Sequence, residues 1–506
     1  MSTSSTEDGG SFAPVISTVA GTGVPGFQGE GEPAITAQLN RPYGIAIDST
    51  GTLYFSDFHN HRVRKITSDG KVSTVAGTGV AGFKGDNGLA TAAQLNWPRE
   101  VAVDSAGNLY IADGNNNRVR KVTTDGIIST VVGSGVASFS GDGGQATAAR
   151  LNLPMGVAVD SAGVLYVSEY HNNRVRKITP DGKISTVAGN GTIGAKGDGG
   201  AATSAQLNRP HALAVDRADN LYIADYANHR VRRVAADGTI STVAGTGAAG
   251  FGGDGGQATA AQLNGSVGVV VDSAGVVFIG DYGNHRVRRV AADGTISTVA
   301  GTGAAGFGGD GGPAASAQVN QPYGLAVDCV DTLYIADFTN NRIRKVTSEK
   351  MAGLPDSGAV VSWANVRSRL RIGVHRESLK DGAEIHQVLA SPRSHQRWRL
   401  IAAGQVDGEV LYRIENVRSG KVLEVADARE TAGAAVAQRA YEGGDAHHQH
   451  WRLIPAGPAN DAPRVFEIAN HHSGLLLRVD ANARTPVTQH DSEGDHRGRQ
   501  WQLLPV

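Results

Sequence analysis

The chain of 506 residues contains a single cysteine, Cys329, which excludes an intramolecular disulfide framework and any cysteine-rich zinc site. No run approaches the ~18 consecutive apolar residues of a membrane helix. Residues 1–17 contain neither the basic nor the apolar segment of a secretory signal. We therefore expect no membrane partner and, by default, a cytoplasmic location, with leaderless export left open.

An excess of charge of one sign is also lacking, because 47 Lys+Arg balance 48 Asp+Glu. This balance argues against a protein that holds nucleic acid or anionic membrane through bulk charge. The 68 glycines argue against long helices, in which glycine is unfavourable. We expect an all-β protein.

The composition changes along the chain, since residues 1–358 carry 56 glycines and one tryptophan, whereas residues 359–506 carry 12 and four. Residues 349–358, EKMAGLPDSG, have the Gly, Pro, Asp and Ser content of a linker. We expect a disordered N-terminus over residues 1–14, one domain over 15–348, a linker over 349–358 and a second domain over 359–506.

The first domain is a repeat with a period of 56 residues. Ser-Thr-Val begins at six equally spaced positions, namely Ser17, Ser73, Ser129, Ser185, Ser241 and Ser297. Each unit contains four short β-rich runs separated by turn signals, which is the content of one propeller blade. The last unit lacks its Ser-Thr-Val strand, and that strand stands alone at Val15–Ala20. We expect a six-bladed β-propeller in which this N-terminal strand completes the sixth blade and removes the open edge.

The repeated residues resemble those of a known family. The pattern Pro-x-Gly-hydrophobic-Ala-hydrophobic-Asp, followed by Leu-Tyr-Ile-Ala-Asp-x-x-Asn-(His/Asn)-Arg-Val-Arg, is similar to NHL-repeat propellers across residues 15–346. The connection at residues 77–96 resembles those of teneurin-like and actinobacterial NHL proteins. The resemblance implies a protein-binding scaffold, an RNA-binding module, or a lyase or hydrolase with metal ligands in the channel.

Charged residues recur at the same positions in every blade. Each third strand carries three basic residues, such as Arg62, Arg64 and Lys65, and the first two strands end in acids, such as Asp48 and Asp57. An RNA-binding face would not carry equal acid, so we interpret the pattern as a structural latch.

The Gly-Asp-Gly-Gly connections lack the spaced carboxylates of a calcium loop. We expect the aspartates of these connections to cap the short segment that follows each turn. They are Asp86 (in Gly-Asp-Asn-Gly), Asp142, Asp198, Asp254 and Asp310.

The repeat breaks where each first strand begins. Propeller geometry places these positions around the mouth of the central channel, together with the turns between the second and third strands. The residues that differ in size and charge there are Tyr43, Arg99, Glu100, Met155, His211 and Tyr323. Convergent aromatic and polar groups are typical of ligand sites, so we predict one at this channel mouth. The alternative is that the same side chains only plug the channel.

Residues 359–506 contain a threefold repeat. Residues 368–374, 419–425 and 473–479 align with one another, and each unit ends in a tryptophan, Trp398, Trp451 or Trp501. The first two carry Gln-x-Trp, whereas Arg499 stands where the third Gln would be. The pattern resembles ricin-type β-trefoil lectin modules, and we expect a β-trefoil with the tryptophans in its core.

The resemblance implies that a sugar site has an Asp in its Leu-Asp-Val segment, a polar residue just before Gln-x-Trp and an aromatic ring as a platform. That acid position holds Gly373, Glu424 and Arg478 in the three units, so only the second unit retains a carboxylate. We predict carbohydrate binding there by Glu424, Gln438, Tyr441 and His448. Ten of the sixteen histidines lie in this domain, and we interpret the group that includes His447, His448 and His450 as a solvated loop rather than a metal site.

The sequence predicts a recognition protein. We expect a monomer without cofactor or bound metal, whose propeller binds a protein, peptide or glycan, with no nucleic acid partner favoured, and whose trefoil binds carbohydrate. A metal-dependent lyase or hydrolase would need His211, Glu100, His59 and His171 to converge at the channel mouth. RNA binding would need the blade arginines to be unpaired and exposed.

Overall fold

The computed structural model describes residues 14–347, apart from 49, 68, 273 and 329–331. It also describes residues 360–365, 371–374, 378–388, 396–406, 409–428, 434–442, 447–455, 465–473, 475–478, 487–490 and 500–505. The chain divides into two compact units, Met1–Ala352 and Gly353–Val506. Of the N-terminus expected to be disordered (1–14), residues 1–13 lie outside the described residues, as do the linker (349–358) and Cys329. Among the described residues, no helix is long and apolar enough to cross a membrane.

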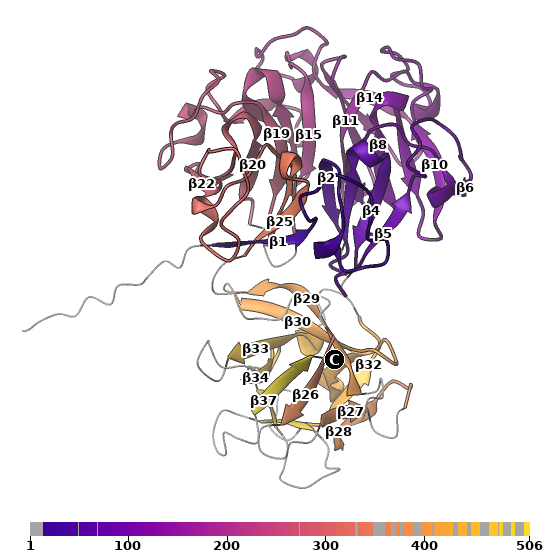
Figure 1. Cartoon of the computed structure of the whole chain (residues 1–506), viewed down its shortest axis with the longest axis vertical. Coiled ribbons are helices and arrows are strands. Elements are labelled where there is room, and N and C mark those ends of the chain that lie inside the picture. The colour runs from indigo at the N-terminus through magenta and orange to yellow at the C-terminus, as the bar shows by residue number, and fades with distance from the viewer. Residues whose placement is uncertain are drawn as a thin grey trace, which may run out of the picture. The chain divides into compact units, whose positions relative to one another are not determined.

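The first unit is built from six antiparallel sheets arranged as the blades of a propeller (Figure 1). Blades one to three contain β2 (Pro42–Ile47), β3 (Leu53–Asp57), β4 (Arg62–Ile66) and β5 (Val72–Ala76), then β7 (Pro98–Val103), β8 (Leu109–Asp113), β9 (Arg118–Val122), β10 (Ile127–Val132) and the short β6 (Gly88–Leu89), then β11 (Pro154–Val159), β12 (Leu165–Glu169), β13 (Arg174–Ile178) and β14 (Ile184–Ala188). Blades four to six contain β15 (Pro210–Val215), β16 (Leu221–Asp225), β17 (Arg230–Val234) and β18 (Ile240–Ala244), then β19 (Ser266–Val271), β20 (Val277–Asp281), β21 (Arg286–Val290) and β22 (Ile296–Ala300), then β23 (Pro322–Val327), β24 (Leu333–Asp337), β25 (Arg342–Thr347) and β1 (Val15–Ala20).

The ring closes through the N-terminal strand, as predicted. β1 pairs antiparallel with β25, with Ile16 opposite Val346 and Thr18 opposite Arg344. The backbone of Ile16 also exchanges hydrogen bonds with Gly311 and Gly312 of the preceding connection. Because Ile16 is fully buried between blades five and six, the strand contributes to the core as well as to the sheet edge.

Short 3-10 helices occur at two places in the blades. One set follows the long connections, at η1 (Ala34–Thr36), η3 (Ala90–Ala92), η5 (Ala146–Ala148), η6 (Ala202–Ser204), η8 (Ala258–Ala260) and η10 (Ala314–Ser316). The other set forms turns between second and third strands, at η2 (Phe58–Asn60), η4 (Gly114–Asn116), η7 (Tyr226–Asn228), η9 (Tyr282–Asn284) and η11 (Phe338–Asn340). The alanine that opens each helix of the first set is buried between neighbouring blades.

The latch prediction is confirmed for one arginine and one acid of each blade. Arg64 is fully buried, and its guanidinium lies 3.5 Å from the buried carboxylate of Asp57. Burial raises the pKa of Asp57 to about 6, so the carboxylate is still ionised at neutral pH. The same pair, at 2.8 to 3.5 Å, recurs as Arg120–Asp113, Arg176–Glu169, Arg232–Asp225, Arg288–Asp281 and Arg344–Asp337. These arginines are therefore not available to RNA.

The capping role expected for the Gly-Asp-Gly-Gly aspartates is wrong. The 3-10 helix that follows Asp86 has no side-chain cap. Instead, Asp86 accepts a 2.6 Å hydrogen bond from Arg120 and a 2.7 Å bond from Thr130 Oγ1. The carboxylate thus supplies the second acid of the latch, and Glu30 takes this place beside Arg64 at 3.7 Å. A buried guanidinium attracts the nearest carboxylate more strongly than an exposed helix end does.

The acids that end the first strands do not join the latch. Asp48 accepts hydrogen bonds from the backbone N–H groups of Thr50 and Thr52, and so closes its own hairpin. This corrects the pairing expected for that series.

The alternation of His and Asn before each third strand has a structural reason. Both residues offer an acceptor at the δ1 position to a backbone N–H of the following blade. His61 Nδ1 accepts from Trp97 at 3.2 Å, and Asn117 Oδ1 accepts from Leu153 at 2.9 Å. The other four bonds of this kind join Arg209 to Asn173, Gly265 to His229, Gln321 to His285 and Arg41 to Asn341.

The second unit consists of one continuous system of twelve strands among its described residues. They are β26 (Val360–Asn365), β27 (Arg371–Val374), β28 (Ala383–Val388), β29 (Trp398–Val406), β30 (Glu409–Asn416), β31 (Val422–Val425), β32 (Val436–Arg439), β33 (Trp451–Pro455), β34 (Val465–Asn470), β35 (Leu476–Arg478), β36 (Thr488–His490) and β37 (Gln500–Pro505), with 3-10 helices η15 (Ala426–Ala428) and η16 (His447–Gln449). The described residues of both units contain no α-helix, which confirms the all-β class.

The tryptophans of the first two Gln-x-Trp segments belong to the core, as predicted. Trp398 and Trp451 are fully buried. Their indole N–H groups donate to the carbonyls of Ile372 and Leu423, at 3.2 and 2.9 Å. Each tryptophan thereby ties the end of its unit to the strand that carries the predicted sugar-binding position.

Candidate functional site

The residues predicted at the channel mouth converge. The rings of Tyr43 and Tyr323 lie 4.0 Å apart, and Tyr43 Oη lies 3.5 Å from Nδ1 of His211 on the opposite blade. Met155 belongs to the same cluster, together with Phe58 and Phe338 from the neighbouring turns. Tyr43, Met155 and His211 are each only 3% exposed. The side chains therefore plug the channel and form the floor of its mouth.

The backbone explains why these side chains face the axis. Each first strand is irregular at its start, as between Pro42 and Ile45, which turns residue 43 into the channel. Gly44 keeps the inner strands close, because a Cβ there would lie 2.5 Å from the Cα of Glu100. In five of the six blades, the residue before the first strand, such as Arg41 or Trp97, has a φ near 55° and costs roughly 1–2 kcal/mol of backbone strain; the fifth blade has Gly265 there.

Burial drives the titratable groups of the plug towards their neutral forms. Desolvation, together with the nearby Arg99 guanidinium, lowers the pKa of His211 to about 3. Glu100 is 7% exposed, and burial raises its pKa to about 8 despite a hydrogen bond from the Ile45 N–H. At neutral pH, Arg99 is therefore the charged group of the plug.

Arginines with aromatic contacts surround this floor. The Arg99 guanidinium lies 5.2 Å from the ring centroid of Phe58 and 5.5 Å from that of Tyr43. Arg41 and Arg209, both exposed, lie 5.4 Å from the rings of Phe338 and Tyr170. In the part of the chain that the structure describes, no carboxylate oxygen lies within 4.0 Å of these three arginines. The face is positively charged and lined by rings.

The geometry does not support the metal-dependent enzyme. Among the described residues, His211, Glu100, His59 and His171 contribute no set of three ligand atoms within 4.8 Å of one another. His59 stacks on Phe58, and His171 packs against Tyr170, so both lie in the aromatic layer.

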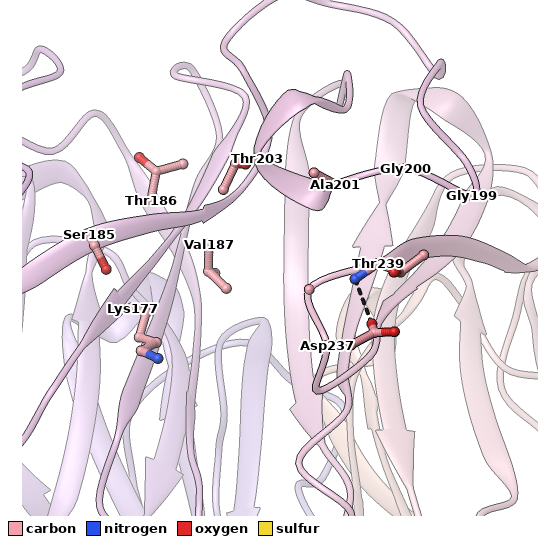
Figure 2. A pocket seen from close by; sticks show the side chains of 11 residues that line it. Lys177, Ser185, Thr186, Val187, Gly199, Gly200, Ala201, Thr203, Asp237 and Thr239 are labelled. Atoms are coloured by element: carbon pink, nitrogen blue, oxygen red, sulfur yellow. Dashed lines mark hydrogen bonds between the residues drawn. The ribbon is translucent and has the colours of Figure 1, made fainter.

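A hollow of about 430 Å³ lies on the rim of the propeller (Figure 2). Lys177, Ser185, Thr186 and the turn Asp237–Gly238 are among its lining residues. Ser185 and Thr186 belong to the repeated Ser-Thr-Val segment, and the Asp-Gly turn also recurs in other blades. Repeated scaffold residues therefore account for its lining.

In the second unit, two of the predicted sugar-site residues meet. The Glu424 carboxylate lies 3.6 Å from His448 Nε2, and its side chain is 2% exposed. The site also contains residues that the prediction missed. Arg439 Nε donates to Glu424 Oε1 at 2.6 Å, Gln449 Nε2 donates to Glu424 Oε2 at 3.2 Å, and Glu442 lies 3.7 Å from His448.

Gln438 does not lie beside Glu424. Glu424 is opposite Ala437 in the pairing of β31 with β32, so alternation turns Gln438 to the other face and Arg439 towards the carboxylate. Gln438 is fully buried, accepts from Ser419 Oγ at 2.7 Å, and donates to the carbonyls of Ser378 and Lys380. These bonds tie β32 to two neighbouring segments, and the period of the strand would have identified Arg439 as the residue that faces Glu424.

Tyr441 is held next to the site. Its hydroxyl lies 3.1 Å from Nε2 of His450, and the Arg413 guanidinium lies 4.6 Å from its ring centroid. His450 is only 2% exposed, so the solvated-loop interpretation is wrong for this residue. At the corresponding positions of the other two repeats, Gly373 and Arg478 offer no carboxylate, and the Arg478 side chain lies outside the described residues.

Comparison with known families agrees with these two architectures. The family described as ricin-type beta-trefoil lectin domain-like matches residues 352–439 and 394–489. The teneurin NHL domain matches residues 81–139 and 135–196, and the NHL repeat matches residues 39–66 and 207–234. The chain contains an NHL-repeat six-bladed propeller and a ricin-type β-trefoil lectin-like domain. This combination supports a binding or scaffold role in general.

Among proteins of known identity, the propeller is similar to teneurins. Teneurin-1 of Gallus gallus is 34% identical over 257 residues, which cover 43% of this chain and 9% of the teneurin. Teneurin-m of Drosophila melanogaster is 35% identical over 230 residues, which cover 41% and 8%. The matched region thus spans less than a tenth of these relatives.

Solved structures share the fold at low identity. A structural genomics protein of unknown function from Bacteroides thetaiotaomicron has a TM-score of 0.51 and 22% identity. An auxiliary nutrient binding protein from the same organism has a TM-score of 0.50 and 18% identity. Each alignment covers 66% of this chain and 76% of the other chain. At such identity the likeness concerns the fold alone.

Proposed function

We propose that the chain is a two-site recognition protein whose trefoil binds a carbohydrate at the second of its three repeats. The observation that carries this is the buried Glu424 carboxylate, which Arg439 and Gln449 orient beside His448. A carboxylate accepts hydrogen bonds from sugar hydroxyls, and a fixed carboxylate does so without losing rotamer entropy. Tyr441 supplies an aromatic ring nearby.

Retention on immobilised sugars tests this assignment. Glu424→Gln keeps the size of the side chain but removes the charge, and should lower affinity by at least tenfold, because a charge-assisted hydrogen bond contributes about 1.5–3 kcal/mol. Glu384→Gln, in the first repeat of the trefoil, is the matched control and should retain wild-type binding. Equal retention of the two variants would contradict the site.

We further propose that the propeller face binds a protein, peptide or glycan through an acidic group. Arg41, Arg99 and Arg209 support this, because they share the face and have no carboxylate partner among the described residues. A buried or half-buried guanidinium gains most from a carboxylate, which it can bind through two parallel hydrogen bonds. The surrounding rings offer flat surfaces for the remainder of such a ligand.

Binding of acidic and neutral forms of one ligand distinguishes a site from a plug. With galacturonic acid and galactose as probes, the acid should bind more tightly, and Arg99→Gln should remove that preference. Lys177→Gln on the rim serves as the control and should not change the preference. A plug without ligand would give no difference between the acid and the neutral sugar, while the melting temperature of Arg99→Gln would still change slightly.

A further inference from the structure

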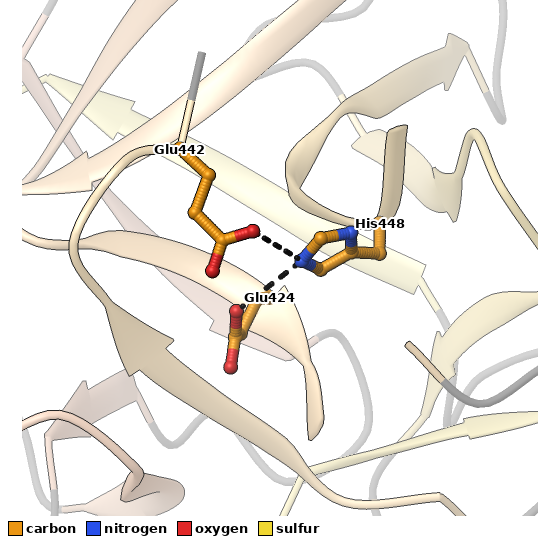
Figure 3. A group of neighbouring side chains, drawn as sticks. All are labelled: Glu424, Glu442 and His448. Atoms are coloured by element: carbon orange, nitrogen blue, oxygen red, sulfur yellow. Dashed lines mark ion pairs between the residues drawn. The ribbon is translucent and has the colours of Figure 1, made fainter. Parts of the chain in front are cut away.

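Three potential metal ligands lie close together in the second repeat of the trefoil. The Nε2 atom of His448 lies 3.6 Å from Glu424 Oε2 and 3.7 Å from Glu442 Oε2, and the three ligand atoms all lie within 4.8 Å of one another. Figure 3 shows both carboxylates directed at the same edge of the imidazole. Glu424 comes from β31, His448 from η16, and Glu442 from the segment after β32.

These separations suit a small dication. Zinc binds imidazole nitrogen and carboxylate oxygen at about 2.0–2.2 Å, so neighbouring ligand atoms of a tetrahedral site are about 3.3 Å apart. The two His448 distances exceed that value by only a few tenths of an ångström. An imidazole favours zinc, copper or nickel over calcium, which takes oxygen ligands.

The neighbours of the cluster hold it in place. Glu424 is 2% exposed, and Arg439 and Gln449 fix its two oxygens. Gln449 is itself fully buried, and it also accepts from the backbone N–H of Glu442 at 3.0 Å and donates to the carbonyl of Ala440. One amide thus positions both carboxylate residues, as outer-shell partners of metal ligands do.

One side of the cluster is open. The Glu442 side chain is 52% exposed and that of His448 is 19% exposed, so a bound ion would reach solvent between them. In the first repeat of the trefoil, Gly373 occupies the position of Glu424, and His386 lies 2.8 Å from Glu384. Within the described part of the chain, no other three His, Cys, Asp or Glu residues meet in this way.

We propose that Glu424, Glu442 and His448 bind one transition-metal dication of the zinc class and leave one coordination position open. The site goes beyond the proposed sugar binding, since zinc can bind whether or not a sugar is present. When a sugar does bind at Glu424, one of its hydroxyls can occupy the open position.

Calorimetric titration of zinc into the chelator-treated full-length chain tests the proposal. We expect one equivalent of zinc to bind at this site with a higher affinity than any zinc that binds to the other histidines. His448→Ala and Glu442→Gln should each weaken this equivalent at least tenfold. His386→Ala and Glu384→Gln break the ion pair in the first repeat of the trefoil and should leave the affinity for this zinc ion unchanged.

Melting temperatures distinguish a metal site from a purely structural cluster. His448→Gln and Glu442→Gln change exposed or partly exposed groups, so for a metal site their melting temperatures without zinc should stay near that of the wild type. Zinc should then raise the melting temperature of the wild type but not of these variants. Equal zinc binding by the wild type and His448→Ala would overturn the proposal, whatever the outcome of the sugar experiments.

Discussion

Glu100 and His211 line the same channel, and burial makes both of them neutral. The pKa of Glu100 is raised to about 8, whereas that of His211 is lowered to about 3. Four of the six blades carry glycine at the position of Glu100, where the inner strands pack closely, namely Gly44, Gly156, Gly268 and Gly324. A protonated glutamic acid is therefore tolerated at a point where a carboxylate would be costly.

This difference makes the stability of the propeller depend on pH. The folded state keeps the Glu100 proton up to a pKa of about 8, but the unfolded state loses it near 4.5. The contribution is therefore fully present below pH 4.5 and is lost as pH rises to 8. Glu100→Gln should match the wild type at pH 5 and exceed its stability at pH 9, by on the order of a few kcal/mol.

Thermal unfolding between pH 5 and pH 9 measures this effect. His211→Gln is the control, because His211 loses stability only as pH falls from 6.5 towards 3. Its alkaline profile should follow that of the wild type. Parallel profiles for Glu100→Gln and the wild type from pH 5 to 9 would show that Glu100 is ionised in the folded protein.

Within one blade, the third strand separates two kinds of basic residue. On β21, Arg288 is fully buried and lies 3.4 Å from Asp281 and 2.6 Å from Asp254. Arg289 is the next residue of β21, points to the opposite face of the sheet and is partly exposed. Alternation along the strand thus places one cation in the latch and the other at the surface.

Removal of the latch cation should destabilise the blade strongly. Arg288→Ala leaves the buried Asp281 carboxylate without its partner, and such a loss costs about 3–5 kcal/mol. Arg289→Ala, on the same strand, should cost no more than ~1 kcal/mol. Chemical denaturation measures both values. A smaller loss for Arg288→Ala than for Arg289→Ala would contradict the latch.

At the scale of the whole propeller, closure depends on a strand that is remote in sequence from its partner. β1 pairs with β25 across the ends of the domain, and Thr18 bonds to Asp310 at 2.6 Å. Without β1, blade six has three strands and an open edge beside the apolar core around Ile16. An exposed edge of this kind promotes pairing with other chains.

Deletion of residues 1–21 should therefore cause aggregation or lower the melting temperature by at least about 5 °C. Deletion of residues 1–13 alone is the control and should have little effect, because β1 remains. Light scattering and calorimetry on the two truncated chains make the comparison. A 1–21 deletion as soluble and stable as the full chain would show that the ring does not need this strand.

The 56-residue period was sufficient to predict the blades, their number and the closure through β1. A period identifies equivalent residues, and equivalent residues occupy equivalent places in a ring. It also indicated which positions at the mouth depart from the common pattern. It could not show that Tyr43 reaches His211 across the axis, since that distance depends on the width of the channel and on the packing of all six inner strands.

The sequence by itself was enough to predict the two domains, the repeats and the burial of Trp398 and Trp451, and it singled out Glu424 as the acid of the predicted sugar site. The tertiary structure alone decided which side chains surround that carboxylate. Gln438 turns away, whereas Arg439, Glu442 and Gln449 turn towards it, because the pairing of β31 with β32 and the hydrogen bond from Glu442 N–H to Gln449 set their directions. Contacts between segments distant in the chain depend on such directions, and no local pattern in the sequence specifies them.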